Sequence, residues 1–271
     1  MLIGARAHDY GRQSAYELSR QLKEAGFEAA QVAIPKCIAG VESFQQITPQ
    51  VLEDVKENFQ KNNISISVLG CYVEPSLLDR EARLKQVNQF LQALTYSKII
   101  GANLVGTETT NFKLEEAKRK DVFEILVDSV LRMVEQAEKV GAHIGIEPVA
   151  KHTLNTPELT YELLERVKSD KLKIIFDPVN LLTLQNMNHQ SKLWMECFEA
   201  FGSKIEAVHA KDVIVEDGAF KPVVLGAGIV EYTPIFKWLN ANKQHISILR
   251  EEVNPVTAAQ DIQFLRSHMT L

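Results

Sequence analysis

Four short apolar segments in the second half of the chain each end in a side chain that can bind a metal ion. They are HIGIE (143–147), KIIFD (173–177), IEAVH (205–209) and ISILRE (246–251), and they end at Glu147, Asp177, His209 and Glu251. Each segment has the length and composition of a buried β-strand. Burying so many polar groups in one place is prohibitive unless a cation holds them. We therefore expect one divalent ion, with Mn²⁺ favoured over Mg²⁺, Co²⁺ or Zn²⁺.

A purely structural interpretation exists for two of these carboxylates. Pro148 follows Glu147 and Pro178 follows Asp177, so each carboxylate could cap a helix that begins at the proline. For a single residue, capping explains the pattern as well as metal binding does. Four successive strands with the same kind of ending favour the metal site.

The rest of the chain supplies elements that could bring the four residues together. Apolar runs predict strands at 2–8, 29–34, 64–70 and 103–108, and helical patterns lie at about 14–25, 79–98, 115–140, 156–168, 190–201, 232–241 and 257–267, with one more helix opened at 48–50. Alternating strands and helices predict parallel strands with right-handed crossovers. Eight such units without a linker in 271 residues predict an α/β fold, a single (β/α)8 TIM barrel over residues 1–271.

In such a barrel all strands point the same way, and their C-terminal ends form the face that carries active sites. Side chains alternate along a strand, which puts the small residues Gly145, Ala207 and Ser247 on the same faces as the candidate ligands. The same alternation favours Glu251 over Glu252 as the fourth ligand. A shift of one residue would exchange the two.

Composition narrows the classes of function. The chain carries 30 basic and 35 acidic residues without a basic block, which argues against a nucleic-acid partner. Three cysteines lie far apart without a CxxC spacing, so we expect neither disulfides nor a cysteine zinc site, and a cytoplasmic location. We expect no signal peptide, because the N-terminal residues lack a basic region followed by a long apolar run, and we expect no membrane span, because no apolar run approaches the length that one needs. The first strand is not followed by GxGxxG, which argues against a dinucleotide-binding fold.

The motifs IGIEP, FDPVN, VHAKD and ILREE, in this order and spacing, resemble the xylose isomerase-like TIM barrels. That superfamily holds sugar isomerases, sugar and sugar-phosphate epimerases, inosose dehydratases and endonuclease IV. The segment 225–239 (LGAGIVEYTPIFKWL) is similar to the family's glycine-containing turn and helix before the last strand. The resemblance covers essentially the whole chain. It implies that Glu147, Asp177, His209 and Glu251 bind one metal ion and that Glu147 and Glu251 also act as acid and base.

One position departs from the family pattern. Many members carry a histidine three residues after the aspartate, where this chain has Asn180. An amide can hydrogen-bond a substrate hydroxyl but cannot transfer protons. Roles that the family gives to that histidine are therefore not expected here.

The predicted function is an enzyme, a metal-dependent isomerase or epimerase of a sugar or sugar phosphate that moves a proton beside a carbonyl through an enediolate. An inosose-type dehydratase on the same site is the alternative. An abasic-site endonuclease needs several further histidines, and a sugar-binding barrel without activity would not need the acid and base. The expected partner is a small sugar or polyol, and the resemblance makes a homodimer reasonable.

Several other residues at predicted strand ends are candidates for substrate binding. Lys211 shares the face of His209 and could neutralise a substrate oxyanion, or pair with a neighbouring aspartate. Arg6 and His8 end the first strand, Glu108 ends the fourth and His152 lies in a polar loop, so these four are candidates beside Asn180. For each of them a solvated side chain without a role in the site is the simpler interpretation.

Overall fold

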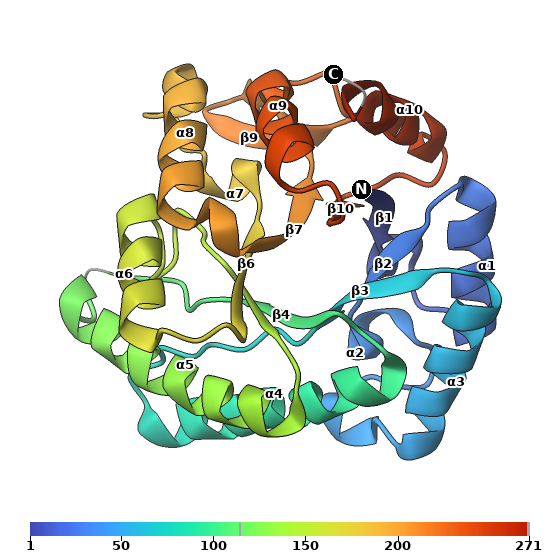
Figure 1. The fold of residues 1–271 in the computed structure, drawn as a ribbon, viewed down its shortest axis with the longest axis horizontal. Helices are drawn as coiled ribbons and strands as arrows, with labels where there is room; N and C mark the ends of the chain where they lie inside the picture. Colours follow the sequence, from blue (N-terminus) through green and yellow to red (C-terminus); the bar gives the residue numbers. More distant parts are fainter. Residues whose placement is uncertain (114, 270–271) are drawn as a thin grey trace.

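Eight parallel strands close into a barrel in the computed structural model, which describes residues 1–113 and 115–269 (Figure 1). The order around the barrel is β1-β10-β7-β6-β5-β4-β3-β2. The strands are β1 (Leu2–Arg6), β2 (Ala29–Val32), β3 (Ser65–Gly70), β4 (Leu104–Glu108), β5 (Ile144–Glu147), β6 (Leu172–Phe176), β7 (Ile205–Ala210) and β10 (Ser247–Arg250). The predicted (β/α)8 barrel is confirmed.

Helices surround the barrel in the predicted order. They are α1 (Ala15–Ala25), α3 (Pro49–Lys61), α4 (Arg80–Ile100), α5 (Arg119–Val140), α6 (Pro157–Val167), α8 (Gln190–Phe201), α9 (Tyr232–Asn242) and α10 (Ala258–His268), with two single-turn helices, α2 (Ile34–Cys37) and α7 (Pro178–Leu181). Among the described residues, no helix is long and apolar enough to cross a membrane.

The helix ends follow local signals in the sequence. The Thr48 hydroxyl accepts a hydrogen bond from the backbone N–H of Val51 and so caps the start of α3. At the other end, α1, α4 and α5 stop at Gly26, Gly101 and Gly141, each with a left-handed backbone that glycine adopts without strain. These helices correspond to the ones predicted at about 14–25, 79–98 and 115–140.

Two predicted strands are shorter in the structure than in the sequence analysis. β1 ends at Arg6 and continues as a 3-10 helix over Ala7–Tyr10, and β2 ends at Val32 before α2. Pro35 lies in the first turn of α2, a position where its missing N–H leaves no hydrogen bond unmade. Both changes lie at the C-terminal face of the barrel, where they redirect the side chains that follow.

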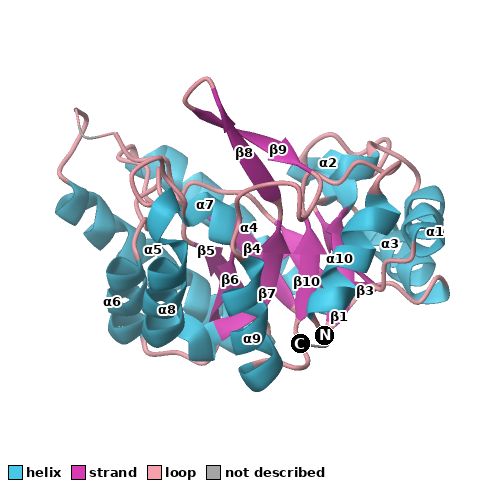
Figure 2. Cartoon of the chain, turned by 90° about the horizontal axis from the view of Figure 1, so that it is seen from above, coloured by secondary structure: helices cyan, strands magenta, loops and turns pink. Residues whose placement is uncertain are grey.

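A β-hairpin that the sequence analysis did not predict stands between β7 and α9. Its strands, β8 (Asp212–Glu216) and β9 (Ala219–Val223), pair antiparallel outside the barrel. Asp217 and Gly218 join them, both with positive φ, as a two-residue hairpin turn requires. Figure 2 shows the hairpin projecting beyond the barrel, on the side where α7 lies. It forms one wall above the C-terminal face.

Small and branched apolar side chains fill the barrel. Its inner cluster consists of Ala29, Val68, Leu104, Ile175, Ala207 and Leu249. Gly145 makes room for them, since a Cβ there would lie 2.6 Å from Leu104 Cδ1. Ser247 is buried and its hydroxyl accepts a hydrogen bond from Ser67 across the barrel at 2.6 Å. The interior is thus packed and positions the strand ends rigidly.

Gly4 gives a test of this packing. A Cβ at Gly4 would lie 2.4 Å from the backbone oxygen of Ala29 and 2.7 Å from Leu249 Cδ2. The neighbouring backbone belongs to the adjacent strand and cannot move away cheaply. We expect Gly4→Ala to lower the free energy of unfolding by about 1–3 kcal/mol, measured by urea denaturation.

Gly70→Ala is the matched control, because its Cβ would meet only side-chain and Cα atoms at 3.1 Å or more. It should cost clearly less than Gly4→Ala. Equal losses for the two variants would contradict the proposed backbone clash.

Candidate metal centre and active site

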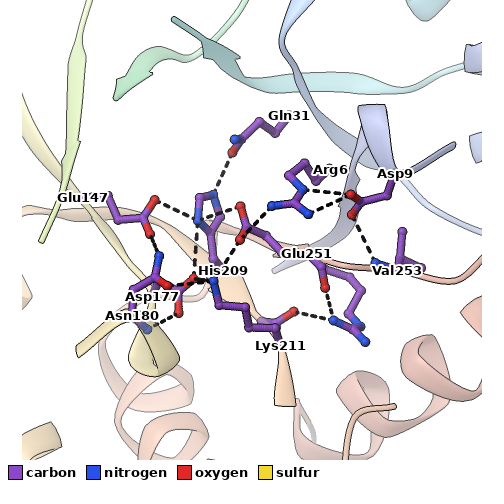
Figure 3. A network of polar contacts seen from close by, with 12 residues as sticks. Arg6, Asp9, Gln31, Glu147, Asp177, Asn180, His209, Lys211, Glu251 and Val253 are labelled. Atoms are coloured by element: carbon purple, nitrogen blue, oxygen red, sulfur yellow. Dashed lines mark hydrogen bonds and ion pairs between the residues drawn. The ribbon is translucent and has the colours of Figure 1, made fainter. Parts of the chain in front are cut away.

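Glu147, Asp177 and His209 meet at the C-terminal face of the barrel (Figure 3). Glu147 ends β5, Asp177 directly follows β6, and His209 lies near the end of β7. Each offers one ligand atom, and these atoms all lie within 4.8 Å of one another. The three side chains are buried. Strand ends far apart in sequence therefore bring two carboxylates and an imidazole together.

Glu251 joins this group from the segment that follows β10. Its Oε1 lies 3.4 Å from His209 Nδ1 and its Oε2 3.3 Å from Arg6 Nη1. Glu252 has a positive φ and is exposed. Glu251 therefore faces the other three candidate ligands, while Glu252 does not.

A hydrogen bond orients the His209 ring. Its Nε2 lies 2.7 Å from Gln31 Oε1, and the Gln31 amide donates in turn to the Tyr72 hydroxyl. Because Gln31 Oε1 can only accept, Nε2 carries the proton and Nδ1 faces the carboxylates. Nδ1 lies 3.1 Å from Glu147 Oε2. The sequence analysis missed Gln31, although a lone glutamine in the apolar run AAQVAI was a signal of it.

Asp177 caps a helix and faces the cluster at the same time. Its Oδ1 accepts a hydrogen bond from the backbone N–H of Asn180 at the start of α7. Its Oδ2 lies 2.9 Å from Lys211 Nζ. The capping interpretation therefore applies to Asp177 without removing it from the site. It does not apply to Glu147, since no helix begins at Pro148.

Lys211 and Asn180 close the cluster on one side. Lys211 is buried, and its Nζ lies 2.8 Å from Asn180 Oδ1 and 3.2 Å from Glu251 Oε2. The Asn180 amide donates to Glu147 Oε1. The residue that replaces the family histidine thus links the lysine to Glu147.

Burial and the neighbouring charges shift the pKa values of these groups, upward for Asp177 and His209 and downward for Glu251. Burial raises the pKa of Asp177, and although Lys211 opposes this, burial together with Glu147 and Glu251 brings the pKa to about 6. Burial lowers the pKa of His209, but Glu251 and Glu147 outweigh burial and raise it to about 9. Burial raises the pKa of Glu251, but His209 and Lys211 bring it down to about 2. The carboxylates therefore favour a cation among them.

The donor set fits a divalent ion. Buried His209 Nδ1 makes no well-directed hydrogen bond among the described residues, although three carboxylates surround it. A metal ion at this point would take the place of an imidazole proton and offset the repulsion among the carboxylates. One nitrogen and three oxygens suit Mn²⁺, Mg²⁺, Co²⁺ or catalytic Zn²⁺.

Arg6 lies next to the cluster as a positioning group. Its guanidinium contacts Glu251 and also Asp9 Oδ1 at 2.8 Å. Asp9 Oδ2 accepts a hydrogen bond from the backbone N–H of Val253. These contacts tie the end of β1 to the segment that carries Glu251. His8 does not reach the cluster: it is half-buried and meets the Tyr72 ring edge-on.

Glu108 and His152 lie together at the edge of the site. Glu108 Oε2 is 3.7 Å from His152 Nδ1. Burial, followed by Glu147 and Glu251, raises the pKa of Glu108 to about 7. The charges of Glu147 and Glu251 therefore affect the pKa of Glu108, although Glu108 lies outside the cluster.

The Asp212 carboxylate holds the glycine-containing turn beside the site. It accepts hydrogen bonds from the backbone N–H groups of Val213, Gly226, Gly228 and Val230. A Cβ at Gly228 would lie 2.2 Å from Asp212 Oδ1, so the turn needs glycine there. The Tyr232 hydroxyl then donates to the Lys211 carbonyl at 2.8 Å. In the VHAKD motif, Asp212 thus holds the glycine-containing turn, while His209 lies in the cluster with Glu147 and Asp177.

Comparison with known proteins agrees with this arrangement. The model of the xylose isomerase-like TIM barrel family matches residues 19–268. The chain belongs to this family. The predicted resemblance to this family is thereby confirmed. No curated protein matches the chain.

Solved structures of the xylose isomerase-like fold superpose over nearly the whole chain. A D-tagatose 3-epimerase-like protein has a TM-score of 0.82 at 18% identity, covering 100% of this chain and 97% of that one. The IolI protein with a bound zinc atom has 0.75 at 18%, covering 100% and 97%. The 3-keto-D-glucoside 4-epimerase YcjR from E. coli has 0.77 at 17%, covering 98% and 99%. At these identities the likeness concerns the fold.

Proposed function

We propose that this protein is a divalent-metal-dependent isomerase or epimerase of a sugar or related keto polyol. The observation that carries the proposal is the position of Glu147 and Glu251, which both lie against His209 Nδ1 at 3.1 and 3.4 Å. Two carboxylates around one cation site suit a reaction that removes a proton and returns another. Relatives of the same fold that are described as epimerases support the proposal.

Glu147, Asp177, His209 and Glu251 would hold the ion. When bound, a divalent cation polarises the substrate carbonyl and stabilises negative charge on its oxygen. The Gln31 hydrogen bond fixes the ring that presents Nδ1, and Arg6 fixes the Glu251 carboxylate. These contacts prepare the ligands before substrate enters.

Proton transfer follows from the two glutamates. One carboxylate removes the proton from the carbon beside the carbonyl, and the electron pair of that C–H bond moves to form an enediolate. The other glutamate, in its protonated form, returns a proton to the opposite face and inverts the centre. Return to the adjacent carbon gives isomerisation instead. Lys211 carries a fixed positive charge beside Glu251, and Asn180 offers an amide to substrate hydroxyls.

Dehydration on the same site is the second candidate. The first step is identical, but the enediolate then expels hydroxide from the neighbouring carbon, with an acid supplying the proton. A nuclease would need more metal ligands. Within the described part of the chain, one group of three side chains that could together hold a metal ion is found, Glu147 with Asp177 and His209.

An exchange experiment tests the proposal. The metal-loaded protein is incubated in D₂O with ketoses, ketose phosphates and inososes, and products are followed by NMR and mass spectrometry. We expect deuterium at one carbon beside the carbonyl of the substrate, together with an epimer or isomer. Loss of one water from the product would favour the dehydratase. The absence of both deuterium exchange and product with every compound of the panel would contradict the proposal.

A further inference from the structure

A cavity of about 570 Å³ opens beside the cluster, between the β8–β9 hairpin, α7 and the segment after β5. Asn180 and Lys211 form part of its inner wall. These two side chains also contact Glu147, Asp177 and Glu251, so the cavity lies directly against the proposed reacting centre. It extends well beyond that centre. A substrate that reaches the glutamates from this side must pass through it.

Much of the cavity wall away from the cluster is apolar. It includes Val149, Val179, Leu182, Val213, Phe220 and Pro222. Leu184 also lines it and is 43% exposed. A volume of this size lies within the range of about 300–1,000 Å³ for pockets that enclose a ligand through apolar walls and a few polar groups. The apolar side chains of this wall cannot hydrogen-bond the hydroxyls of a bare sugar, although the polar residues Thr183 and Gln185 also line the cavity.

The charges in the cavity do not suit a phosphate. Among its described lining residues the cations are Lys151 and Lys211. The ammonium of Lys211 already lies between Asp177 and Glu251, and the carboxylate of Glu252 also lines the cavity. A phosphate requires several cationic or N–H donors. Lys151 alone, opposed by Glu252, does not provide them.

The hairpin contributes the aromatic surface. Phe220 on β9 is half-buried, packs partly against the main core and presents the rest of its side chain to the cavity. Because β8 and β9 are linked to the barrel through the buried Asp212, the hairpin is anchored at its base. The ring is therefore held in place beside the cavity (Figure 2 shows the hairpin above the barrel).

We propose that the substrate is an unphosphorylated keto sugar or keto polyol that carries an apolar substituent, and that this substituent binds between Phe220 and the apolar wall from β5 and α7. The proposal rests on the function proposed above, which it deepens. It assigns Phe220 as a residue that determines substrate specificity, away from the reacting atoms.

A set of matched probes tests the substituent. Keto-glucosides are suitable because the anomeric group can be varied without changing the carbonyl: the methyl 3-keto-glucoside, its phenyl counterpart and the 6-phosphate of the methyl compound. Dissociation constants are measured by calorimetry with the metal-loaded protein. We expect the phenyl compound to bind at least about tenfold more tightly than the methyl compound, and the phosphate to bind no more tightly. Equal binding of phenyl and methyl compounds, tightest binding of the phosphate, or binding of none would overturn the proposal.

Variants locate the effect on the hairpin. Phe220→Ala should weaken binding of the phenyl compound and so remove its tenfold advantage over the methyl compound. Ile214→Ala, on the same hairpin but away from the cavity lining, is the control and should keep the advantage. An advantage that survives Phe220→Ala, or is lost equally in both variants, would contradict the assignment of Phe220.

Turnover is followed separately by deuterium exchange. Tight, Phe220-dependent binding of the phenyl compound without exchange would support the cavity assignment and contradict the proposed reaction. Exchange with unsubstituted or phosphorylated sugars, without an advantage for the phenyl compound, would support the reaction and contradict the cavity assignment.

Discussion

Glu147→Gln is expected to lower kcat/KM by at least about 10³-fold and to weaken metal binding. Glutamine keeps the size of the side chain but can neither take up a proton nor supply a charged ligand. A positioned acid or base contributes about 10²–10⁴-fold to a rate, and the lost ligand adds to this. The carboxylate of Glu147 lies 3.1 Å from His209 Nδ1 and accepts from Asn180, so the substitution acts at the centre of the cluster.

Glu251→Gln should have a similar effect, and the adjacent Glu252→Gln is the matched control. Glu251 is buried against His209, whereas Glu252 is exposed. The control should therefore leave metal content and metal affinity unchanged, whereas Glu251→Gln should lower both. Metal content by mass spectrometry, metal affinity by calorimetry and circular dichroism separate loss of the site from loss of the fold. Full activity in Glu147→Gln would rule out its assignment as acid or base.

The cluster could be predicted because its information is local. Each of Glu147, Asp177, His209 and Glu251 ends an apolar run, and parallel strands necessarily bring their C-terminal ends to one face. Prediction of the barrel required only the alternation of strands and helices along the sequence. Neither inference required knowledge of which side chains touch.

Gln31 shows where this reasoning ends. Its contact with His209 joins residues 178 positions apart, across the barrel from β2 to β7. A polar residue within a short buried strand can face either side, and the sequence does not say which distant side chain it will meet. His8 fails for a related reason. The sequence predicts that His8 ends the first strand, but β1 ends at Arg6 and a 3-10 helix carries His8 away from the cluster.

The hairpin, by contrast, had a local signal that was overlooked. Asp-Gly at 217–218 between two apolar stretches is a strong indication of a two-residue turn. The eight-unit pattern of strands and helices does not call for an additional pair of strands between β7 and α9. The hairpin lines the cavity beside the cluster, so the missed element is the one that bears on specificity.

Asp261→Ala is expected to lower the free energy of unfolding by about 3–5 kcal/mol, because it leaves a buried guanidinium without its partner. Arg250 is 2% exposed and Asp261 is fully buried. Arg250 Nε donates to Asp261 Oδ2 at 2.8 Å, and Asp261 Oδ1 accepts from the backbone N–H of Leu225. The substitution therefore also frees the turn that follows the hairpin.

Two comparisons make the result specific. The double substitution of Arg250→Met with Asp261→Leu should recover part of the stability, since apolar side chains of similar volume can replace a buried ion pair, although the backbone groups that the pair contacted lose their partners. Glu124→Ala, which breaks the exposed pair with Arg166, should leave the urea midpoint nearly unchanged. A loss below about 1 kcal/mol in Asp261→Ala would contradict the assigned role of the pair.

Asp261→Ala should also lower the activity of the protein under conditions in which the variant is fully folded. Arg250 immediately precedes Glu251, and its guanidinium also donates to the Glu251 carbonyl and to the Val223 carbonyl of β9. One buried ion pair therefore joins α10, the end of the hairpin and the segment that carries a proposed catalytic glutamate. At low temperature, where the variant stays folded, kcat/KM should still drop by about tenfold or more because Glu251 is less precisely held. Unchanged kcat/KM in the folded variant would show that Arg6 and Lys211 alone suffice to position Glu251.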